Sequence, residues 1–154
     1  MELFSKTKDT VEATLKKLGL DPKQALAKSN DDLASYTLMR GSAAVLVTVV
    51  HRPEQKAVFL RVASPVMTPA EGNHEALYKR LLEMNAAGLA NAAFALLQDK
   101  VVAVSERPAE NLDPGEVEQM IRHLSAVADT YDDRLVKEFG GKRASDQGSA
   151  RQDR

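Results

Sequence analysis

Three histidines are the side chains in this sequence best suited to binding a metal, but their spacing does not form a ligand set. His51, His74 and His123 fall in three separate segments. The pair His74-Glu75 begins like the H-E-x-x-H helix of zinc peptidases, yet Tyr78 stands where the second histidine is needed. The sequence has no cysteine, which excludes disulfides, thiolate zinc sites and cysteine nucleophiles. We therefore expect no metal site and no bound cofactor.

Motifs for nucleophilic catalysis and for phosphate binding are also missing. The sequence contains no G-x-S-x-G elbow, no G-x-x-x-x-G-K-[S/T] loop and no G-x-G-x-x-G turn. Two carboxylate pairs remain as acid–base candidates, Asp31-Asp32 in a predicted loop and Asp132-Asp133 on the solvent side of a predicted helix. We expect no enzymatic activity, and an enzyme with an unrecognised site assembled from distant residues is kept as an alternative.

Charge and aromatic content argue against direct binding of nucleic acid or membrane. The 154 residues include 21 basic and 22 acidic side chains, so the formal net charge is −1 and the chain has no broad basic field. Four phenylalanines, three tyrosines and no tryptophan offer few platforms for stacking bases. No apolar run approaches the ~20 residues of a membrane helix, and the charged residues 1–6 lack the apolar core of a signal peptide. We expect a cytoplasmic protein.

The apolar periodicity of the first half predicts a helix followed by three strands. Apolar positions three or four apart form one helix face that ends at Gly19: Phe4, Thr7, Val11, Leu15 and Leu18. The period then changes to two, which predicts strands over residues 33–40, 43–51 and 56–64. Because short turns join them, we expect a three-strand antiparallel meander.

The second half predicts a helix, two strands and a long helix. The patterns indicate a helix over 74–87 and strands over 91–97 and 101–106. Asp113-Pro114-Gly115-Glu116 combines an acidic cap, a first-position proline and a third-position glutamate, which is typical of a helix start. The predicted fold class is α+β in the order α-β-β-β-α-β-β-α, as one domain over 1–139. Residues 140–154 have no apolar periodicity and are expected to form a disordered polar tail.

Two of the predicted strands carry apolar side chains on both faces. In the strand 43–51, Val45, Val47 and Val49 alternate with Leu46, Thr48 and Val50. In the strand 91–97, both alternating sets are apolar: Ala92, Phe94 and Leu96 on one face, and Ala93, Ala95 and Leu97 on the other. A sheet covered by helices on one face normally alternates apolar with polar positions. The sequence leaves two explanations open: a second layer from the same chain covers the other face, or another chain does.

The segment Leu77-Tyr78-Lys79-Arg80-Leu81-Leu82-Glu83-Met84-Asn85 is similar to a helix with the pattern leucine-leucine-x-x-asparagine. Class I, CesT-type, type III secretion chaperones and YbjN-like domains place such a helix before their fourth strand. The strand Ala92 to Leu97, the turn Gln98-Asp99, the strand Val101 to Glu106 and the linker Leu112 to Glu116 follow in the matching order. The chain thus resembles these families over residues 1–139. It departs from them in its mildly acidic body and its lack of tryptophan.

The resemblance implies a small α+β domain that is commonly a homodimer, with no cofactor and no catalysis. Secretion chaperones hold an extended client segment around apolar patches made by the first helix and the sheet. We therefore predict a non-enzymatic, homodimeric, chaperone-like module that binds a partner protein through apolar grooves. A regulatory partner of a nucleic-acid-processing protein, acting by protein contacts in signalling or stress response, is the alternative.

Residues for both interfaces follow from these patterns. The expected dimer interface is on the helix that carries the resemblance: Leu77, Leu81, Leu82 and Asn85. The expected groove for a partner protein uses the first helix and the valine-rich strands: Phe4, Val11, Val47, Val49 and Phe59.

Overall fold

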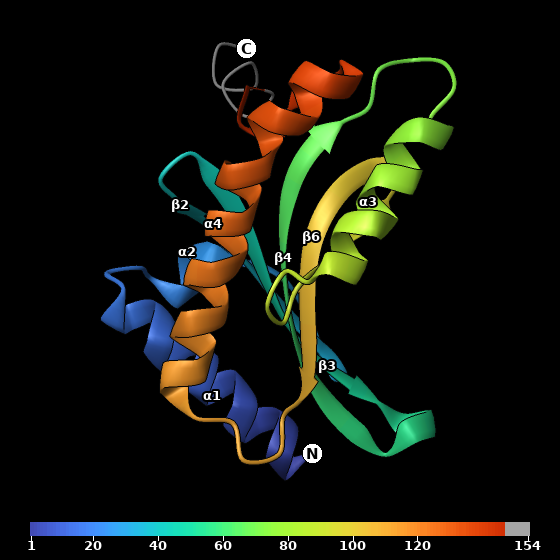
Figure 1. Ribbon diagram of the computed structural model, residues 1–154. Helices are drawn as coiled ribbons and strands as arrows, with labels where there is room; N and C mark the ends of the chain where they lie inside the picture. The colour runs from blue at the N-terminus through green and yellow to red at the C-terminus, as the bar shows by residue number, and fades with distance from the viewer. Residues whose placement is uncertain (147–154) are drawn as a thin grey trace.

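A seven-stranded antiparallel sheet forms the centre of the structure, a computed structural model that describes residues 1–146 (Figure 1). The strands lie in the order β1-β2-β3-β4-β6-β5, and β7 pairs with the end of β4. Their bounds are β1 Leu26–Asn30, β2 Leu33–Arg40, β3 Ala43–Arg52, β4 Ala57–Thr68, β5 Ala93–Leu97, β6 Lys100–Pro108 and β7 Lys142–Arg143. The helices are α1 Glu2–Lys17, α2 Pro22–Ala25, α3 Glu75–Ala87 and α4 Pro114–Phe139, with a 3-10 turn at Pro53–Gln55. The α+β prediction is confirmed.

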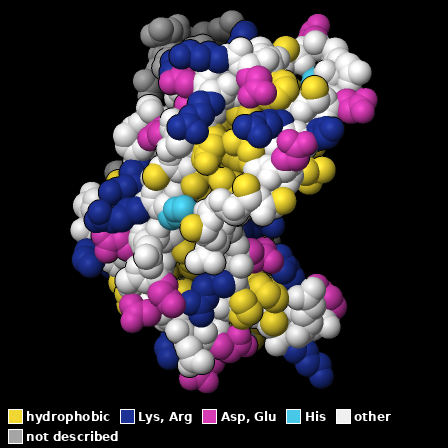
Figure 2. Space-filling model, viewed as in Figure 1, with side chains coloured by type: hydrophobic (Ala, Val, Ile, Leu, Met, Phe, Trp, Pro, Cys, Tyr) yellow, Lys and Arg dark blue, Asp and Glu magenta, His cyan; other side chains and the backbone are white. Residues whose placement is uncertain are grey.

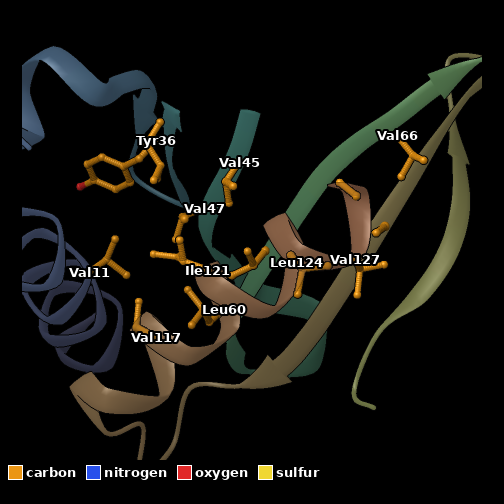
Figure 3. Close-up of a cluster of buried hydrophobic side chains, with 14 of the residues drawn as sticks. Val11, Tyr36, Val45, Val47, Leu60, Val66, Val117, Ile121, Leu124 and Val127 are labelled. Carbon is orange, nitrogen blue, oxygen red and sulfur yellow. The ribbon is translucent and has the colours of Figure 1, made fainter. Parts of the chain in front are cut away.

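One face of the sheet is buried under α1 and the long helix α4, which cross β3 and β4 (Figure 1). Every second residue of β3 and β4 is buried, as the two-residue period of a half-covered strand requires. Figure 3 shows the resulting core, in which apolar side chains of α1, β3, β4 and α4 meet: Val11, Val45, Val47, Leu60, Ile121 and Leu124.

The start of α4 is formed by a capping box, which an arginine of β6 ties to the sheet. The Asp113 side chain accepts a hydrogen bond from the Gly115 N–H (2.6 Å), and the Glu116 carboxylate accepts one from the Asp113 N–H (2.9 Å). Arg107 of β6 donates to the same Glu116 carboxylate at 2.7 Å. The cap therefore satisfies free amides of the helix and also ties α4 to β6.

The structure differs from the sequence prediction in three places. β1 was not expected, and its side chains are all exposed, so it leaves no apolar period. β4 continues through Pro65 to Thr68, where the prediction had a connection; a register irregularity between Pro65 and Met67 accommodates the proline. The predicted tail 140–154 contains β7, in which Lys142 and Arg143 pair with β4, while residues 147–154 lie outside the described residues.

Gly141 allows β7 to reach β4. Its φ is +91°, and a Cβ at this position would lie 2.3 Å from the Thr68 carbonyl oxygen. Gly19 also has a positive φ (+82°), but a Cβ there would meet no atom within 4 Å. A comparison of alanine substitutions at the two positions therefore distinguishes the cost of a positive φ, which both share, from the cost of a steric collision, which only Gly141 has.

We predict that Gly141→Ala destabilises the protein more than Gly19→Ala does. Both alanines enter the left-handed region at a cost of roughly 1–2 kcal/mol, but only the first collides with the backbone, which adds about 1–3 kcal/mol. Urea unfolding followed by circular dichroism measures the difference. Equal losses in the two variants would show that β7 does not depend on this close approach.

Asp132 on α4 was predicted to face solvent together with Asp133, but it is buried, because its side of the helix packs toward the core. This burial raises the pKa of Asp132, and the charges of Asp133 and Asp129 add to the rise. A carboxyl whose pKa rises on folding lowers stability as pH increases through the range between its unfolded and folded pKa values. Below the unfolded pKa, about 3.9 for Asp, the penalty disappears.

Asp132→Asn should therefore raise the melting temperature at neutral pH and leave it unchanged below about pH 3. The asparagine oxygen can still accept the hydrogen bond from the Asp133 N–H (2.7 Å). Asp133→Asn is the control, because Asp133 is exposed and pairs with Arg143 at 2.9 Å. A gain of the same size at both pH values would contradict the electrostatic explanation.

Candidate functional site

The face of the sheet opposite α1 and α4 is left uncovered. Along β2, β3 and β4 its side chains alternate with the buried ones and stay half exposed or exposed, so no helix of residues 1–146 covers it there; on β6, Val102 on this face is buried. We call this surface the open face and define it by the residues that the register places on it: Leu33, Ser35, Thr37, Met39, Leu46, Thr48, Val50, Arg52, Phe59, Arg61, Ala63, Val104, Glu106, Ala93, Ala95 and Leu97. It contains many apolar side chains without a covering layer.

A row of small and apolar side chains crosses five strands of the open face. The ladder register aligns them from β2 to β5: Thr37, Leu46, Ala63, Val104 and Ala93. Beside this row, the hydroxyl groups of Ser35 and Thr48 are hydrogen-bonded to each other at 3.0 Å. The row is therefore a shallow apolar strip whose polar neighbours already have partners.

A paired charge cluster lies along one side of the strip, in the next rows of β3, β4 and β6. The Arg52 guanidinium stacks on the Phe59 ring, 4.5 Å from its centroid, and donates two hydrogen bonds to Glu106 at 2.9 and 2.8 Å. Arg61 also approaches Glu106, at 3.4 Å. The hydrogen bonds from Arg52 lower the pKa of Glu106, so its carboxylate stays charged and the cluster stays closed.

The structure separates Phe59 from the other residues predicted to contact a partner. Phe4, Val11, Val47 and Val49 are buried in the core formed with α1 and α4. Phe59 alone lies on the open face. The valine-rich strand β3 is apolar on both faces, and the sequence does not say which face α4 covers.

The four residues predicted for the dimer interface also have different positions. Leu77 and Leu81 are buried, whereas Leu82 is 69% exposed. Asn85 acts within the chain: its side chain accepts a hydrogen bond from the Phe94 N–H (2.7 Å) and donates one to the Phe94 carbonyl (3.1 Å). Asn85 therefore bonds the outer edge of β5 as a neighbouring strand would.

Two exposed leucines that were not selected from the sequence lie on β5, the strand that α3 contacts. Leu96 and Leu97, at the end of β5, are 45% and 55% exposed, and α3 packs beside this strand. Two consecutive leucines at a strand end place apolar side chains on both faces, which is the signal that sequence reasoning could have used. Figure 2 shows further hydrophobic side chains gathered between α3 and α4. Tyr131 of α4 packs edge-to-face on Phe94 of β5, with 5.4 Å between the ring centroids.

The three histidines serve separate local hydrogen bonds. His51 pairs with Asp32 at 2.7 Å, His123 with the Leu89 carbonyl at 2.7 Å, and His74 with the Ala70 carbonyl. Within residues 1–146, no three histidine or carboxylate side chains come together as a metal site. In the same part of the chain, no helix is long and apolar enough to span a bilayer.

Comparison with solved structures relates this fold to chaperone–effector assemblies. The structure titled the ExsC-ExsE complex matches with a TM-score of 0.63 and 20% identity, over 88% of this chain and 97% of the other. The HopA1-SchA chaperone-effector complex matches at 0.56 and 15%, over 85% and 94%. The heterodimeric ExoU-SpcU complex of the Pseudomonas aeruginosa type III secretion system matches at 0.53 and 17%, over 83% and 96%. At these identities, the likeness shows the fold alone.

Sequence comparison then gives the family. Among curated proteins, none matches this chain significantly. A family profile described as "T3SS (YopN, CesT) and YbjN peptide-binding chaperone 1" does match, over residues 5–147. Since this match spans almost the whole chain and the fold agrees, the resemblance seen in the sequence is confirmed, and the chain belongs to the family of type III secretion and YbjN peptide-binding chaperones.

Proposed function

We propose that this protein is a non-enzymatic, homodimeric, cytoplasmic chaperone that holds an extended segment of a partner protein against the open face of its sheet. The observation that carries the proposal is the apolar open face itself, which no helix of the described chain covers. Contiguous exposed apolar surface on a folded domain is typical of a protein-binding site. Membership of a peptide-binding chaperone family supports the same conclusion.

The geometry of the open face suits an extended segment. The small side chain of Ala63 leaves space between the larger Leu46 and Val104, and that of Ala93 leaves space beyond Val104. The Phe59 ring, held by Arg52, offers an aromatic anchor to one side of the strip, four residues before Ala63 on β4. Aromatic and arginine side chains dominate the energetics of many protein interfaces. The strip and the anchor together would bind apolar side chains of the partner, while the paired charges set its position.

The proposed dimer uses α3 and β5. Leu82 and Leu96 are large, exposed apolar residues on two adjacent elements, while Leu97 belongs to the open face. A second copy that covers these leucines would remove them from water, at about 25 cal/mol per Å² of apolar surface. Leu77, Leu81 and Asn85 support this surface from inside by packing and by bonding the β5 edge.

Ala63→Asp should reduce capture of the partner protein at least about tenfold, a loss of about 1.4 kcal/mol. The substitution places an unpaired charge in the middle of the apolar strip, where an apolar partner would have to desolvate it. The measurement is affinity capture from a lysate of the source organism, quantified by mass spectrometry. Ala126→Asp on the exposed side of α4 is the matched control. Equal capture by the two variants would refute binding at the open face.

The double variant Leu82→Asp with Leu96→Asp, which leaves the open face unchanged, should shift the protein from dimer to monomer. Light scattering at micromolar concentration should give twice 16.8 kDa for the wild type and 16.8 kDa for the variant. Met39→Asp provides the control, because Met39 is 59% exposed but lies on β2, away from α3 and β5. A wild type that is already monomeric, or a control that dissociates equally, would contradict the proposed interface.

A further inference from the structure

The charged residues of the sheet are almost all basic. Strands β1 to β6 contain six arginine or lysine residues and a single acidic residue, Glu106, although the whole chain has a net charge of −1. The acidic residues that balance them lie elsewhere: α4, on the buried side of the sheet, carries six acidic and three basic residues. The two sides of the molecule therefore differ in charge.

Most of the basic residues of the strands lie on the same side of the sheet as the open face. The basic side chains on this side are Lys28, Arg52, Arg61 and Lys100. The register places the two lysines opposite Ser35 and Leu97, which belong to the open face. Glu106 is the one acidic residue that β1 to β6 place there. Four positive charges thus face one negative charge.

Arg52 neutralises Glu106, which leaves the charge of Arg61 without a full counter-charge. The Arg52 guanidinium donates two hydrogen bonds to the Glu106 carboxylate, at 2.9 and 2.8 Å, whereas Arg61 approaches the same carboxylate at 3.4 Å. The paired bonds from Arg52 are the stronger arrangement, because they engage both carboxylate oxygens. The Arg61 side chain stays 43% exposed, and a guanidinium has five donors, so most of its donors are available to a ligand.

Arg61 lies between the two apolar features of the open face. Phe59, Arg61 and Ala63 follow one another at every second position of β4 and point to the same side. Next to Arg61 on β3, the hydroxyl of Thr48 is already hydrogen-bonded to Ser35 and supplies no counter-charge. A partner segment that contacts both the apolar strip and the Phe59 ring must therefore pass over the Arg61 guanidinium and displace water from it.

We propose that the partner segment carries an acidic side chain between two apolar ones, and that Arg61 selects it. In an extended segment every second side chain points the same way, about 7 Å apart, which matches the spacing along β4. One apolar side chain packs on Ala63, the carboxylate accepts hydrogen bonds from Arg61, and the other apolar side chain packs on Phe59. Lys28 and Lys100 attract the same acidic segment from the rim. This inference rests on the proposed function and adds the chemistry of the partner.

The alternatives to a carboxylate fit this position less well. An apolar or basic side chain over Arg61 would leave the guanidinium desolvated without a new counter-charge, which is costly. A nucleic acid would be attracted by the same cations, but Phe59 is the one aromatic side chain of the open face, and Arg52 already stacks on it. The apolar strip beside Arg61 also offers nothing to a row of phosphates.

The test uses two heptapeptides that differ in one charge. Both are acetylated and amidated, carry an uncharged fluorophore, and have leucine at the second and sixth positions and serine elsewhere. The fourth residue is aspartate in one peptide and asparagine, its neutral isostere, in the other. Anisotropy titrations measure their binding to the wild type, Arg61→Gln and Arg122→Gln. Arg122 is 57% exposed on α4, so its substitution is a matched loss of charge away from the open face.

The wild type and Arg122→Gln should bind the aspartate peptide about fivefold more tightly than the asparagine peptide. Arg61→Gln should bind the two peptides equally, because glutamine has no charge to offer the carboxylate. The preference of the wild type should decline as the salt concentration rises from about 0.05 to about 0.5 M, since the pair lies at the surface.

Three results would overturn the proposal. They are equal binding of both peptides by the wild type, a preference for aspartate that survives in Arg61→Gln, and no saturable binding of the aspartate peptide up to about 1 mM. A single-stranded oligothymidylate of similar length that binds the wild type more tightly than the aspartate peptide would also overturn it, in favour of a nucleic-acid surface.

The outcome is separable from that of the proposed function. If both peptides bind equally while Ala63→Asp still loses the partner protein, binding at the open face stands and selection by Arg61 fails. If Ala63→Asp keeps the partner protein, binding at the open face fails whatever the peptides show at Arg61.

Discussion

Burial of one sheet face under α4 is the constraint on which the rest of the structure depends. The helix is 26 residues long, so it crosses β3, β4 and β6 and presents its apolar side, from Val117 to Leu135, to all three. Its start is fixed by Asp113 and by the bond between Arg107 and Glu116. Since the described chain provides no comparable helix for the other face, the apolar side chains there remain accessible. The surface available to a partner is thus a consequence of how the core is closed.

The two outer edges of the sheet, on β5 and on β1, are each protected from pairing with another strand. Asn85 bonds the outer edge of β5 at Phe94, which protects that strand from uncontrolled pairing. The opposite edge, β1, is short, irregular between Leu26 and Lys28, and carries a lysine, all of which discourage edge-to-edge association. Unspecific pairing is therefore blocked at these positions.

The sequence was sufficient for the main elements because their signals are local. The capping residues before α4 and the alternation in β3 each arise within a few residues, and both were predicted. β1 has no apolar period, and the strand beyond Pro65 continues only through an irregularity in the register, so neither was found. The site was predicted less well because Val47 and Leu46 are both apolar, and only packing against α4 decides which of them is buried. Asn85 was selected by resemblance, but its bond to Phe94 depends on a contact that the pattern does not contain.

The comparison with other structures separates what the fold requires from what recognition requires. Structures with only 15–20% identity share this architecture over 83–88% of the chain, so many different apolar side chains can fill its core. The core needs the correct period and volume, and volume-conserving changes there cost little. The stacked pair of Arg52 and Phe59 and the apolar strip through Ala63 contribute little to the core, because they lie on the half-exposed side of the sheet. Their identities are free to follow the partner. Specificity for the proposed partner should therefore reside on the open face, where a substitution changes binding with little effect on folding.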